Sequence, residues 1–402
     1  MKVIIRPGAA RGTVAAPPSK SMAHRLLICA ALAEGESIVR GVDPSEDILA
    51  TADCLTALGA SLLREGDAVL VRGTDPRKSR DAVLRCRESG STLRFMIPLC
   101  LLSGSSMRLE GSEKLLSRPL SVYEDLCRQQ NFLLSRENGG LQVCGRLVPG
   151  EYAVPGNISS QFITGLLFAL PLLSRDSTVR LVPPVESRSY LSLTLQALQD
   201  AGIPVSWKDE YTLTVPGSAA YRPRDTAVEG DYSNAAFFEA LNCAGGSVAV
   251  TGLRADSLQG DRIYQEYLPK LQAGCPELDL TDCPDLAPAL FAAAALCHGA
   301  VFTGTRRLQF KESDRGAVMA EEMAKFGILL KTEENRITVP VGNIRTPAVP
   351  LESHNDHRIA MALSLLCTRT GGEIRGAEAV RKSFPDYWDR LRSLGISVEA
   401  RD

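Results

Sequence analysis

The sequence predicts a mixed α/β (α+β) fold with two lobes, each built from three repeated units around buried helices. Two helix-like patterns each recur six times along the 402 residues. Short apolar stretches such as Ala68–Val71 and Tyr211–Val215 lie between them and are typical of strands. A chain of this length is too long for one ordinary compact core, so we expect two lobes.

The first recurring pattern is a nearly all-apolar segment that opens on small, polar or proline residues. A helix that is apolar on every side has to be enclosed, so we expect six buried helices. Five of the six segments end near a glycine, which is typical of helix C-termini. The segments open at Ser19, Ser89, Ser159, Asp231, Pro284 and Asn355.

The second pattern is an amphipathic helix that ends at a turn residue and is followed by a strand-like stretch. Both series share one short interval of 53 residues between their fourth and fifth copies, against 68 to 72 residues elsewhere. Because the two series are independent, this shared irregularity indicates true repeats. The turn residues are Gly59, Asn131, Gly202, Gly274, Gly327 and Gly395.

The composition is that of a soluble globular protein, with 45% apolar residues, 23% charged residues and a net charge of −2. This balance argues against nucleic acid or anionic lipid as a partner. The long apolar stretches, Phe162–Leu173 and Leu286–Cys297, are shorter than the roughly 20 residues a bilayer requires, so we expect no membrane span.

The cysteines and the N-terminus predict a cytoplasmic protein. The 11 cysteines are odd in number and include no CxxC pair, which suggests neither a zinc cluster nor a disulfide framework. The N-terminal apolar run reaches Arg6 after three residues, too short for the apolar region of an export signal.

Basic residues accompany several predicted helix starts. Lys20 and Arg25 flank the first start, Arg94 follows the second and Arg358 lies in the sixth. Backbone N–H groups at a helix start lack partners within the helix and carry partial positive charge, which suits phosphate or carboxylate. If the buried helices of a lobe run parallel, their starts open on one face, and two facing lobes would enclose anionic substrates. Simple N-capping is the alternative at any single start.

Two further charged clusters precede predicted amphipathic helices. Lys311–Arg315 contains two cations and two carboxylates, and Arg381–Tyr387 offers more cations. Taken alone, the first also fits a generic charged helix start and the second a solvated face. His354 and His357 are three residues apart, but no third ligand follows from the spacing, so we expect no metal.

Eight short motifs along the chain together resemble the 5-enolpyruvylshikimate-3-phosphate synthase family, also called 3-phosphoshikimate 1-carboxyvinyltransferase. Their order and spacing match the family over nearly the full length. The motifs are Pro18–Ser21 with Arg25, Ser89–Arg94, Ser117–Leu120, Ser159–Phe162, Glu229–Asp231, Lys311–Arg315, Asn355–Arg358 and Lys382–Tyr387.

The resemblance implies a transferase of the shikimate pathway, which makes chorismate and the aromatic amino acids. It would move the enolpyruvyl (carboxyvinyl) group of phosphoenolpyruvate to the 5-hydroxyl of shikimate 3-phosphate and release phosphate, without cofactor or metal. It also implies the enolpyruvyl transferase fold of two lobes, each with three βαβαββ-type units. One lobe would be discontinuous, with residues 1–14 and 228–402 and the acid and base groups. Residues 15–227 would form the other, with shikimate 3-phosphate contacts; we expect a monomer.

The resemblance also implies site residues. The shikimate 3-phosphate contacts would be Lys20, Ser21, Arg25, Ser159, Ser160, Gln161, Ser187, Asp285 and Lys311. The phosphoenolpyruvate contacts would be Lys20, Gly90, Arg118, Gln161, Arg315, Arg358 and Lys382. Asp285 would take the hydroxyl proton, and Glu312 with Lys20 or Lys311 would deliver a proton to C3 of phosphoenolpyruvate.

Two alternatives remain at this point. The sister enzyme that transfers enolpyruvyl to UDP-N-acetylglucosamine shares the six-unit fold, but it typically carries a cysteine before an Arg-Pro pair. The corresponding stretch here, Gly111–Pro119, contains none. The repeats could also build a non-catalytic anion-binding scaffold, which would have no need for Asp285 and Glu312 beside the cations.

Overall fold

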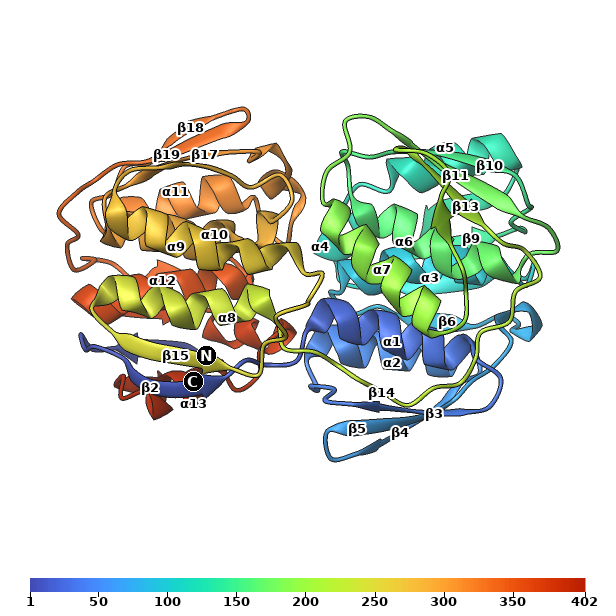
Figure 1. Ribbon diagram of the computed structural model, residues 1–402, viewed down its shortest axis with the longest axis horizontal. Helices are drawn as coiled ribbons and strands as arrows, with labels where there is room; N and C mark the ends of the chain where they lie inside the picture. Colours follow the sequence, from blue (N-terminus) through green and yellow to red (C-terminus); the bar gives the residue numbers. More distant parts are fainter. Residues whose placement is uncertain (402) are drawn as a thin grey trace. The chain divides into compact units, whose positions relative to one another are not determined.

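The computed structural model describes residues 1–401 and separates into two compact units (Figure 1). Met1–Pro17 and the chain from Gly230 onward form unit 1, and Pro18–Glu229 forms unit 2. Each unit has its own hydrophobic core. The lobe boundaries expected from the sequence, after residues 14 and 227, lie within a few residues of these limits.

Three buried helices fill the interior of unit 2, and each begins at the serine that the sequence predicted. The side-chain oxygens of Ser19, Ser89 and Ser159 each accept a hydrogen bond from a backbone N–H in the first turn, which caps the helix. Nearly every residue in the three helices is buried, as the all-apolar pattern requires. They are α1 (Lys20–Leu32), α3 (Gly90–Cys100) and α6 (Ser160–Ala169).

The amphipathic helices of unit 2 end at the predicted turn residues. Asn131, the one non-glycine of that series, has φ 56° and ψ 44°, the left-handed conformation that ends a helix. A short extra helix, α4 (Glu113–Leu116), precedes the second of them. The amphipathic helices are α2 (Glu46–Ala57), α5 (Ser121–Gln130) and α7 (Arg188–Asp200).

Unit 2 contains three four-stranded sheets with one shared topology. In each, the first two strands run parallel and the last two form an antiparallel hairpin. The first sheet has the order β14 (Thr226–Ala227), β3 (Glu36–Arg40), β5 (Ala68–Arg72), β4 (Ser61–Glu65). The second has β6 (Val83–Arg85), β7 (Met107–Glu110), β9 (Gly140–Cys144), β8 (Leu133–Glu137). The third has β10 (Glu151–Pro155), β11 (Ser177–Val182), β13 (Thr212–Val215), β12 (Ser206–Trp207).

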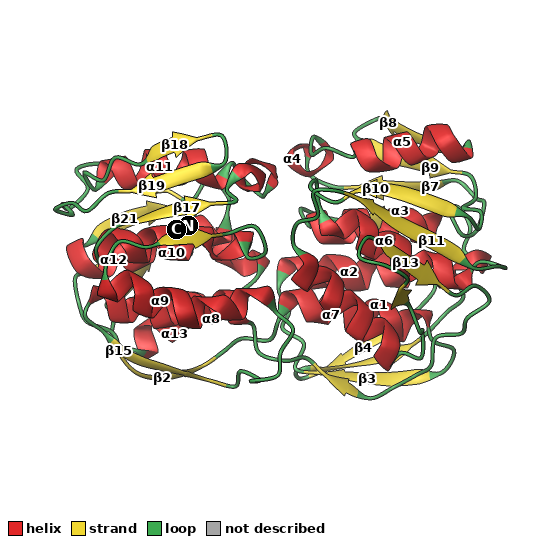
Figure 2. Ribbon diagram, turned by 45° about the horizontal axis from the view of Figure 1, so that its top comes forward, coloured by secondary structure: helices red, strands yellow, loops and turns green. Residues whose placement is uncertain are grey.

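Unit 1 repeats this plan with three more buried helices and three amphipathic ones. Helix α12 packs against both α8 and α10. Figures 1 and 2 show these helices between the β2–β15 pair and the sheet that contains β17 and β19. The buried helices are α8 (Tyr232–Glu239), α10 (Ala287–Leu296), which follows a 3₁₀ turn at Pro284–Leu286, and α12 (His357–Thr370). The amphipathic helices are α9 (Tyr264–Ala273), α11 (Arg315–Lys325) and α13 (Tyr387–Ser393). Among the described residues, no helix combines the length and apolarity needed to cross a membrane.

The fourth repeat lacks its hairpin, which explains the short interval in the sequence. Its strand β15 (Ser247–Thr251) pairs only with β2 (Arg11–Ala15), and the chain passes from α9 straight to the next sheet. That sheet has the usual order, β16 (Glu277–Asp279), β17 (Ala300–Thr303), β19 (Arg336–Val339), β18 (Lys331–Glu333).

The N-terminal strand completes the last sheet of unit 1, a placement that the repeat pattern alone left open. β1 (Lys2–Ile5) pairs antiparallel with both of its neighbours, where a hairpin strand lies in the other sheets. The sheet has the order β20 (Leu351–Glu352), β21 (Gly372–Arg375), β1, β22 (Val398–Arg401). Strands separated by nearly the whole chain are therefore adjacent in one core.

The buried position of β1 predicts the effect of truncating one of its side chains. Ile5 is 1% exposed, so Ile5→Ala should lower the free energy of unfolding by about 2–5 kcal/mol through lost burial and a cavity. Leu329→Ala, at a position 73% exposed, should change it by less than about 0.5 kcal/mol. Urea unfolding in a Trp207→Phe background, followed by the fluorescence of Trp388, which is buried in unit 1, measures both variants. Equal effects would contradict the placement of β1.

Candidate active site

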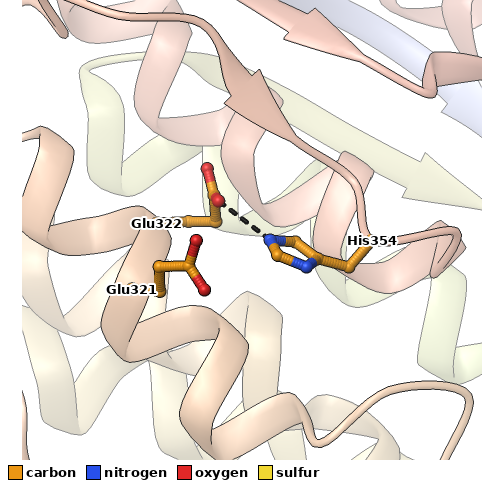
Figure 3. Close-up of side chains that lie close together, drawn as sticks. All are labelled: Glu321, Glu322 and His354. Carbon is orange, nitrogen blue, oxygen red and sulfur yellow. Dashed lines mark hydrogen bonds and ion pairs between the residues drawn. The ribbon is translucent and has the colours of Figure 1, made fainter.

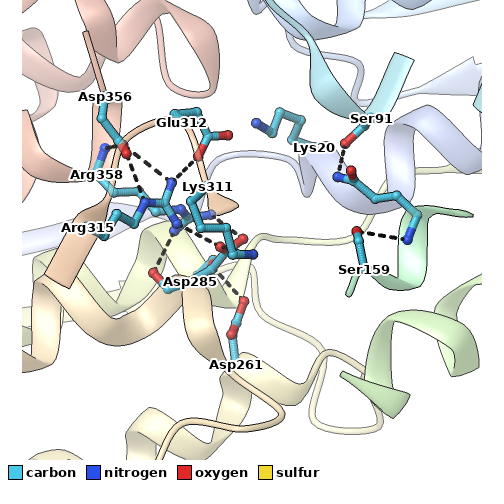
Figure 4. Close-up of polar contacts among 12 residues, drawn as sticks. Lys20, Ser91, Ser159, Asp261, Asp285, Lys311, Glu312, Arg315, Asp356 and Arg358 are labelled. Atoms are coloured by element: carbon cyan, nitrogen blue, oxygen red, sulfur yellow. Dashed lines mark hydrogen bonds and ion pairs between the residues drawn. The ribbon is translucent and has the colours of Figure 1, made fainter. Parts of the chain in front are cut away.

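In unit 2, the first turn of α6 is joined to the first turn of α3 through Gln161. The side-chain oxygen of Gln161 accepts a hydrogen bond from Arg94 Nη1 at 2.6 Å, and its side-chain nitrogen donates to Ser91 Oγ at 2.9 Å. The Arg94 guanidinium also lies over the ring of Phe162, 5.0 Å from its centroid. Ser91 and Ser159 can be located in Figure 4. These contacts hold two helix starts and one cation together.

The start of α1 is joined to the same group through Asp47 on α2. Lys20 Nζ lies 2.8 Å from an Asp47 carboxylate oxygen, and Thr92 of α3 donates to the Asp47 carbonyl at 3.4 Å. Deeper in the unit, His24 contacts Thr51 at 2.8 Å. The three buried helices of unit 2 therefore bring their N-terminal ends together, as the sequence predicted for helices that run parallel.

Arg25 binds protein groups of α1 and α7. It donates to Thr194 Oγ1 at 2.9 Å and to the carbonyls of Ser21 at 2.5 Å and Tyr190 at 3.0 Å. Burial lowers the pKa of Arg25 to about 10, so it stays charged at neutral pH. Ser187, which immediately precedes α7, is buried in a left-handed conformation with φ 57°.

Gly90 lets Arg118 approach the start of α3. A Cβ atom on residue 90 would lie 2.6 Å from Arg118 Nη1, too close for any real contact. The missing side chain therefore leaves room for a guanidinium beside the helix N-terminus. Ser160 is buried in the first turn of α6, directly after its capping serine.

In unit 1, the buried guanidinium of Arg315 is surrounded by three carboxylates (Figure 4). Arg315 is 1% exposed, and its nitrogens lie 2.8 Å from Asp285, 2.6 Å from Glu312 and 2.9 Å from Asp356. Asp285 comes from the turn before α10, Asp356 from the cap of α12, and Arg315 from the start of α11. The planar fork of an arginine suits several carboxylates at once.

Asp285 is itself surrounded by three cations. Its carboxylate lies 2.8 Å from Arg315, 3.1 Å from Lys311 and 3.2 Å from Arg358. Burial by itself would raise the pKa of Asp285, but the positive charges of Arg358, Lys311 and Arg315 outweigh it and hold the pKa well below its ordinary value. Asp285 is therefore ionised at neutral pH and can accept a proton.

Lys382, the last predicted cation, is attached to the turn that precedes α12. Its Nζ donates to the Asn355 carbonyl oxygen at 2.7 Å. The side chain is half-buried, whereas the neighbouring Arg381 is exposed. Of the basic residues in this predicted cluster, Lys382 is thus the one held against other protein groups of the site.

The structure adds two buried carboxylates for which the sequence analysis gave no role. Asp356 caps α12 and accepts from Arg315 and from Ser313 Oγ, the latter at 3.0 Å. Its position in the Asn355–Arg358 motif was the available signal. Asp261 accepts from Ser233 Oγ at 2.6 Å, and burial together with the negative charge of Asp285 raises its pKa to about 7. Asp261 lies before α9 in the atypical fourth repeat, and no local pattern marked it.

The predicted site residues thus fall into two groups, one in each unit. In unit 2, the residues at or beside the helix starts are Lys20, Ser21, Gly90, Arg118, Ser159, Ser160 and Gln161. Arg25 lies where α1 contacts α7, and Ser187 lies directly before α7. Within unit 1 the ion pairs gather Asp285, Lys311, Glu312, Arg315 and Arg358, and Lys382 lies on the adjoining turn.

The sequence analysis expected no metal at His354 and His357, and His357 is not part of the group of possible metal ligands found among the described residues. His354 instead groups with Glu321 and Glu322, with one ligand atom from each residue within 4.8 Å of the others (Figure 3). Glu322 lies 2.9 Å from His354 Nε2 and 2.7 Å from Lys325 Nζ. Because a lysine already neutralises this buried carboxylate, the donor set fits a protein ion pair.

Comparisons with known proteins agree on one family. The family model described as EPSP synthase (3-phosphoshikimate 1-carboxyvinyltransferase) matches residues 5–391. The 3-phosphoshikimate 1-carboxyvinyltransferase of Clostridium kluyveri is 37% identical, covering 99% of this chain and 98% of that protein. The protein of the same name from Clostridium perfringens is also 37% identical, covering 98% of each. A solved structure of EPSP synthase from Acinetobacter baumannii has a TM-score of 0.80 at 23% identity over 100% of both chains, which confirms the predicted fold class.

The ion pairs of Asp285 predict how stability changes with pH. Asp285→Asn leaves three cations without their shared carboxylate, so we expect the variant to be less stable than the wild type at neutral pH. Because the folded-state pKa is lowered, this contribution is present above about pH 4 and is lost as the pH falls through the lowered pKa. Urea midpoints at about pH 7 and about pH 3 measure the difference, which should shrink at the lower pH.

Asp389→Asn is the control, since Asp389 is 75% exposed and pairs with Arg392 on the surface of α13. Its midpoint should match that of the wild type at both pH values. A difference between the Asp285 variant and the wild type that does not change with pH would contradict the ion pairs assigned to Asp285.

Proposed function

The chain belongs to the EPSP synthase family, and on that premise we propose that it transfers the enolpyruvyl group of phosphoenolpyruvate to the 5-hydroxyl of shikimate 3-phosphate. The observation that carries the proposal is a carboxylate, Asp285, held ionised among three cations in a protein whose relatives are named 3-phosphoshikimate 1-carboxyvinyltransferase. The reaction belongs to the shikimate pathway to the aromatic amino acids.

The proposed reaction consists of an addition followed by an elimination. The substrate hydroxyl oxygen bonds to C2 of phosphoenolpyruvate, the hydroxyl loses its proton, and C3 gains one. The tetrahedral product then loses a proton from C3 and inorganic phosphate from C2, which restores the double bond. Each half needs one group that accepts a proton and one that donates it.

Asp285 is the proposed base for the hydroxyl proton. A carboxylate with a strongly lowered pKa is a weak base, and this alone would oppose the transfer. The same cations, Arg315, Arg358 and Lys311, are the proposed ligands of the anionic substrates. When phosphate or carboxylate oxygens share these cations, less positive charge acts on Asp285, so its pKa rises. Substrate binding would therefore make the base stronger at the step that needs it.

Three residues are candidates for protonating C3. Glu312 accepts from Arg315 at 2.6 Å. Lys20 lies 2.8 Å from Asp47. Burial lowers the pKa of Lys311, which makes its ammonium group a stronger acid than an exposed lysine. Because that ammonium gives up its proton more readily, Lys311 is the proposed donor.

Substrate anions would be bound by cations and helix starts. We propose Lys20, Ser21, Arg25, Ser159, Ser160, Gln161, Ser187, Asp285 and Lys311 for shikimate 3-phosphate, and Lys20, Gly90, Arg118, Gln161, Arg315, Arg358 and Lys382 for phosphoenolpyruvate. The gathered N-termini of α1, α3 and α6 support this, because their N–H groups and adjacent cations suit phosphate.

We further propose a cytoplasmic monomer whose chemistry uses only protein side chains. All 11 cysteines are free thiols, although Cys54 and Cys86 have sulfur atoms 3.9 Å apart, which suits a reducing compartment. Sedimentation equilibrium of the purified protein should give the mass of one chain, 43.3 kDa. A concentration-independent mass of twice that value would contradict the monomer.

A phosphate-release assay tests the proposed reaction directly. We expect release only when phosphoenolpyruvate and shikimate 3-phosphate are both present, because each anion alone lacks its reaction partner. Replacing the acceptor by UDP-N-acetylglucosamine should give no release. Release with phosphoenolpyruvate and UDP-N-acetylglucosamine, but not with phosphoenolpyruvate and shikimate 3-phosphate, would instead identify the sister transferase. Binding of both substrates without any release would identify an anion-binding scaffold.

Asp285→Asn should separate binding from turnover. The variant keeps every proposed cation but loses the base, so kcat should fall by about 10²–10⁴-fold. The dissociation constant of phosphoenolpyruvate, measured by calorimetry without shikimate 3-phosphate so that no variant turns over, should rise by no more than about twofold, since no cation is removed. Asp389→Asn should leave both quantities at wild-type values. Normal kcat in the Asp285 variant would rule out its role as the base.

A further inference from the structure

Glu322 on α11 is a fully buried carboxylate outside the ion-pair cluster of Asp285. It is 0% exposed, and its oxygens accept from Lys325 Nζ at 2.7 Å, His354 Nε2 at 2.9 Å and the backbone N–H of Glu352 at 3.0 Å. Lys325 belongs to the same helix, but the other two donors lie on the segment that leads into α12. A buried charge is stable only with such partners. The carboxylate of Glu322 therefore serves to hold these three groups in place.

Glu322 provides the second of two attachments between α11 and the segment 351–356. The first attachment is at the start of the helix, where Arg315 Nε and Ser313 Oγ both donate to Asp356, at 2.9 Å and 3.0 Å. Glu322 lies seven residues after Arg315, which is about 10 Å along a helix. Two attachments this far apart define the direction of the segment as well as its position.

The segment between the two attachments has a backbone conformation that needs support. His354 and Asn355 are consecutive non-glycine residues with φ 51° and φ 57°, in the sparsely populated left-handed region. The side chain of His354 is held by Glu322, and the carbonyl oxygen of Asn355 accepts from Lys382 Nζ at 2.7 Å. A change in the orientation of these two residues would therefore move the partner of Lys382.

We propose that Glu322, acting through His354, is a positioning residue for the cations Arg315 and Lys382. It touches neither substrate; it sets the turn whose Asp356 aligns Arg315 and whose Asn355 aligns Lys382. The inference rests on the proposed function, because it assigns these two cations to phosphoenolpyruvate. Losing this support should weaken phosphoenolpyruvate binding more than shikimate 3-phosphate binding.

The neighbouring Glu321 supplies a matched control. It lies on the same helix, one residue away and beside the same histidine, but it is exposed (Figure 3). Glu321→Gln and Glu322→Gln remove the same charge from adjacent positions. Any effect of net charge on anion binding is therefore common to both variants, and only the buried attachment differs.

The experiment measures KM for each substrate, kcat and melting temperature. Glu322→Gln should raise KM for phosphoenolpyruvate about tenfold and KM for shikimate 3-phosphate less than twofold, because a displaced cation loses its alignment. Glu321→Gln should match the wild type. His354→Ala should reproduce the Glu322→Gln effect, and His354→Gln, which restores a donor of similar reach, should recover most of it.

A double variant, Glu322→Gln with His354→Ala, should raise KM for phosphoenolpyruvate no further than either single variant, because both remove one contact. Should Glu322→Gln fail to fold, His354→Ala still provides the test, since His354 is 26% exposed. A lower melting temperature with both KM values unchanged would overturn the proposal, as would additive effects in the double variant.

Two further outcomes distinguish a positioning role of Glu322 from a metal site and from a failure of the proposed function. If a chelator gives the wild type the defect of Glu322→Gln and Zn²⁺ reverses it, then Glu322 is a metal ligand and the proposal is wrong. Calorimetric binding of each substrate alone, with the other substrate absent, gives the same comparison of variants without turnover. A wild type that binds both substrates but releases no phosphate would refute the proposed function, while the ratio of affinities between the Glu322 and Glu321 variants would still decide the inference.

Discussion

The buried ion pairs of Arg315 hold together the starts of three helices of unit 1. A guanidinium removed from water requires nearby negative charge, and three carboxylates from different segments supply it. Since Asp285 precedes α10 and Asp356 caps α12, satisfying this one cation brings two helix starts to the start of α11. The stability of the unit and the geometry of the proposed site therefore depend on the same buried charges.

The two units join the starts of their buried helices through different kinds of contact. In unit 2 the helix starts are joined mainly by neutral groups, with Gln161 between Arg94 and Ser91, and by the pair of Lys20 with Asp47. In unit 1 they are joined by charges. Neutral contacts leave the positive ends of the helices available to an anion. The charged cluster keeps Asp285 ionised, as the proposed proton transfer requires. The two arrangements suit binding and acid–base chemistry respectively.

The repeats share one plan, and the fourth repeat departs from it. Four repeats place a hairpin on their sheet, and the sixth has β1 and β22 in its place, but the fourth has only the β2–β15 pair and connects α9 directly to β16. That shortened repeat also contributes Asp261, a buried acid beside Asp285 whose pKa is raised to about 7 by burial and by that neighbour. The pKa values of the two neighbouring carboxylates are thus shifted in opposite directions, because only Asp285 is surrounded by cations.

The repeats, the helix starts and the turn residues could be predicted from the sequence alone, because each depends on neighbours close along the chain. A capping serine such as Ser89, or a left-handed Asn131, acts within one turn of its own helix. The place of β1 in the last sheet and the contact of Glu322 with His354 could not be predicted in this way, since neither leaves a local periodic signal. Such contacts join residues from different elements, and packing alone brings those elements together.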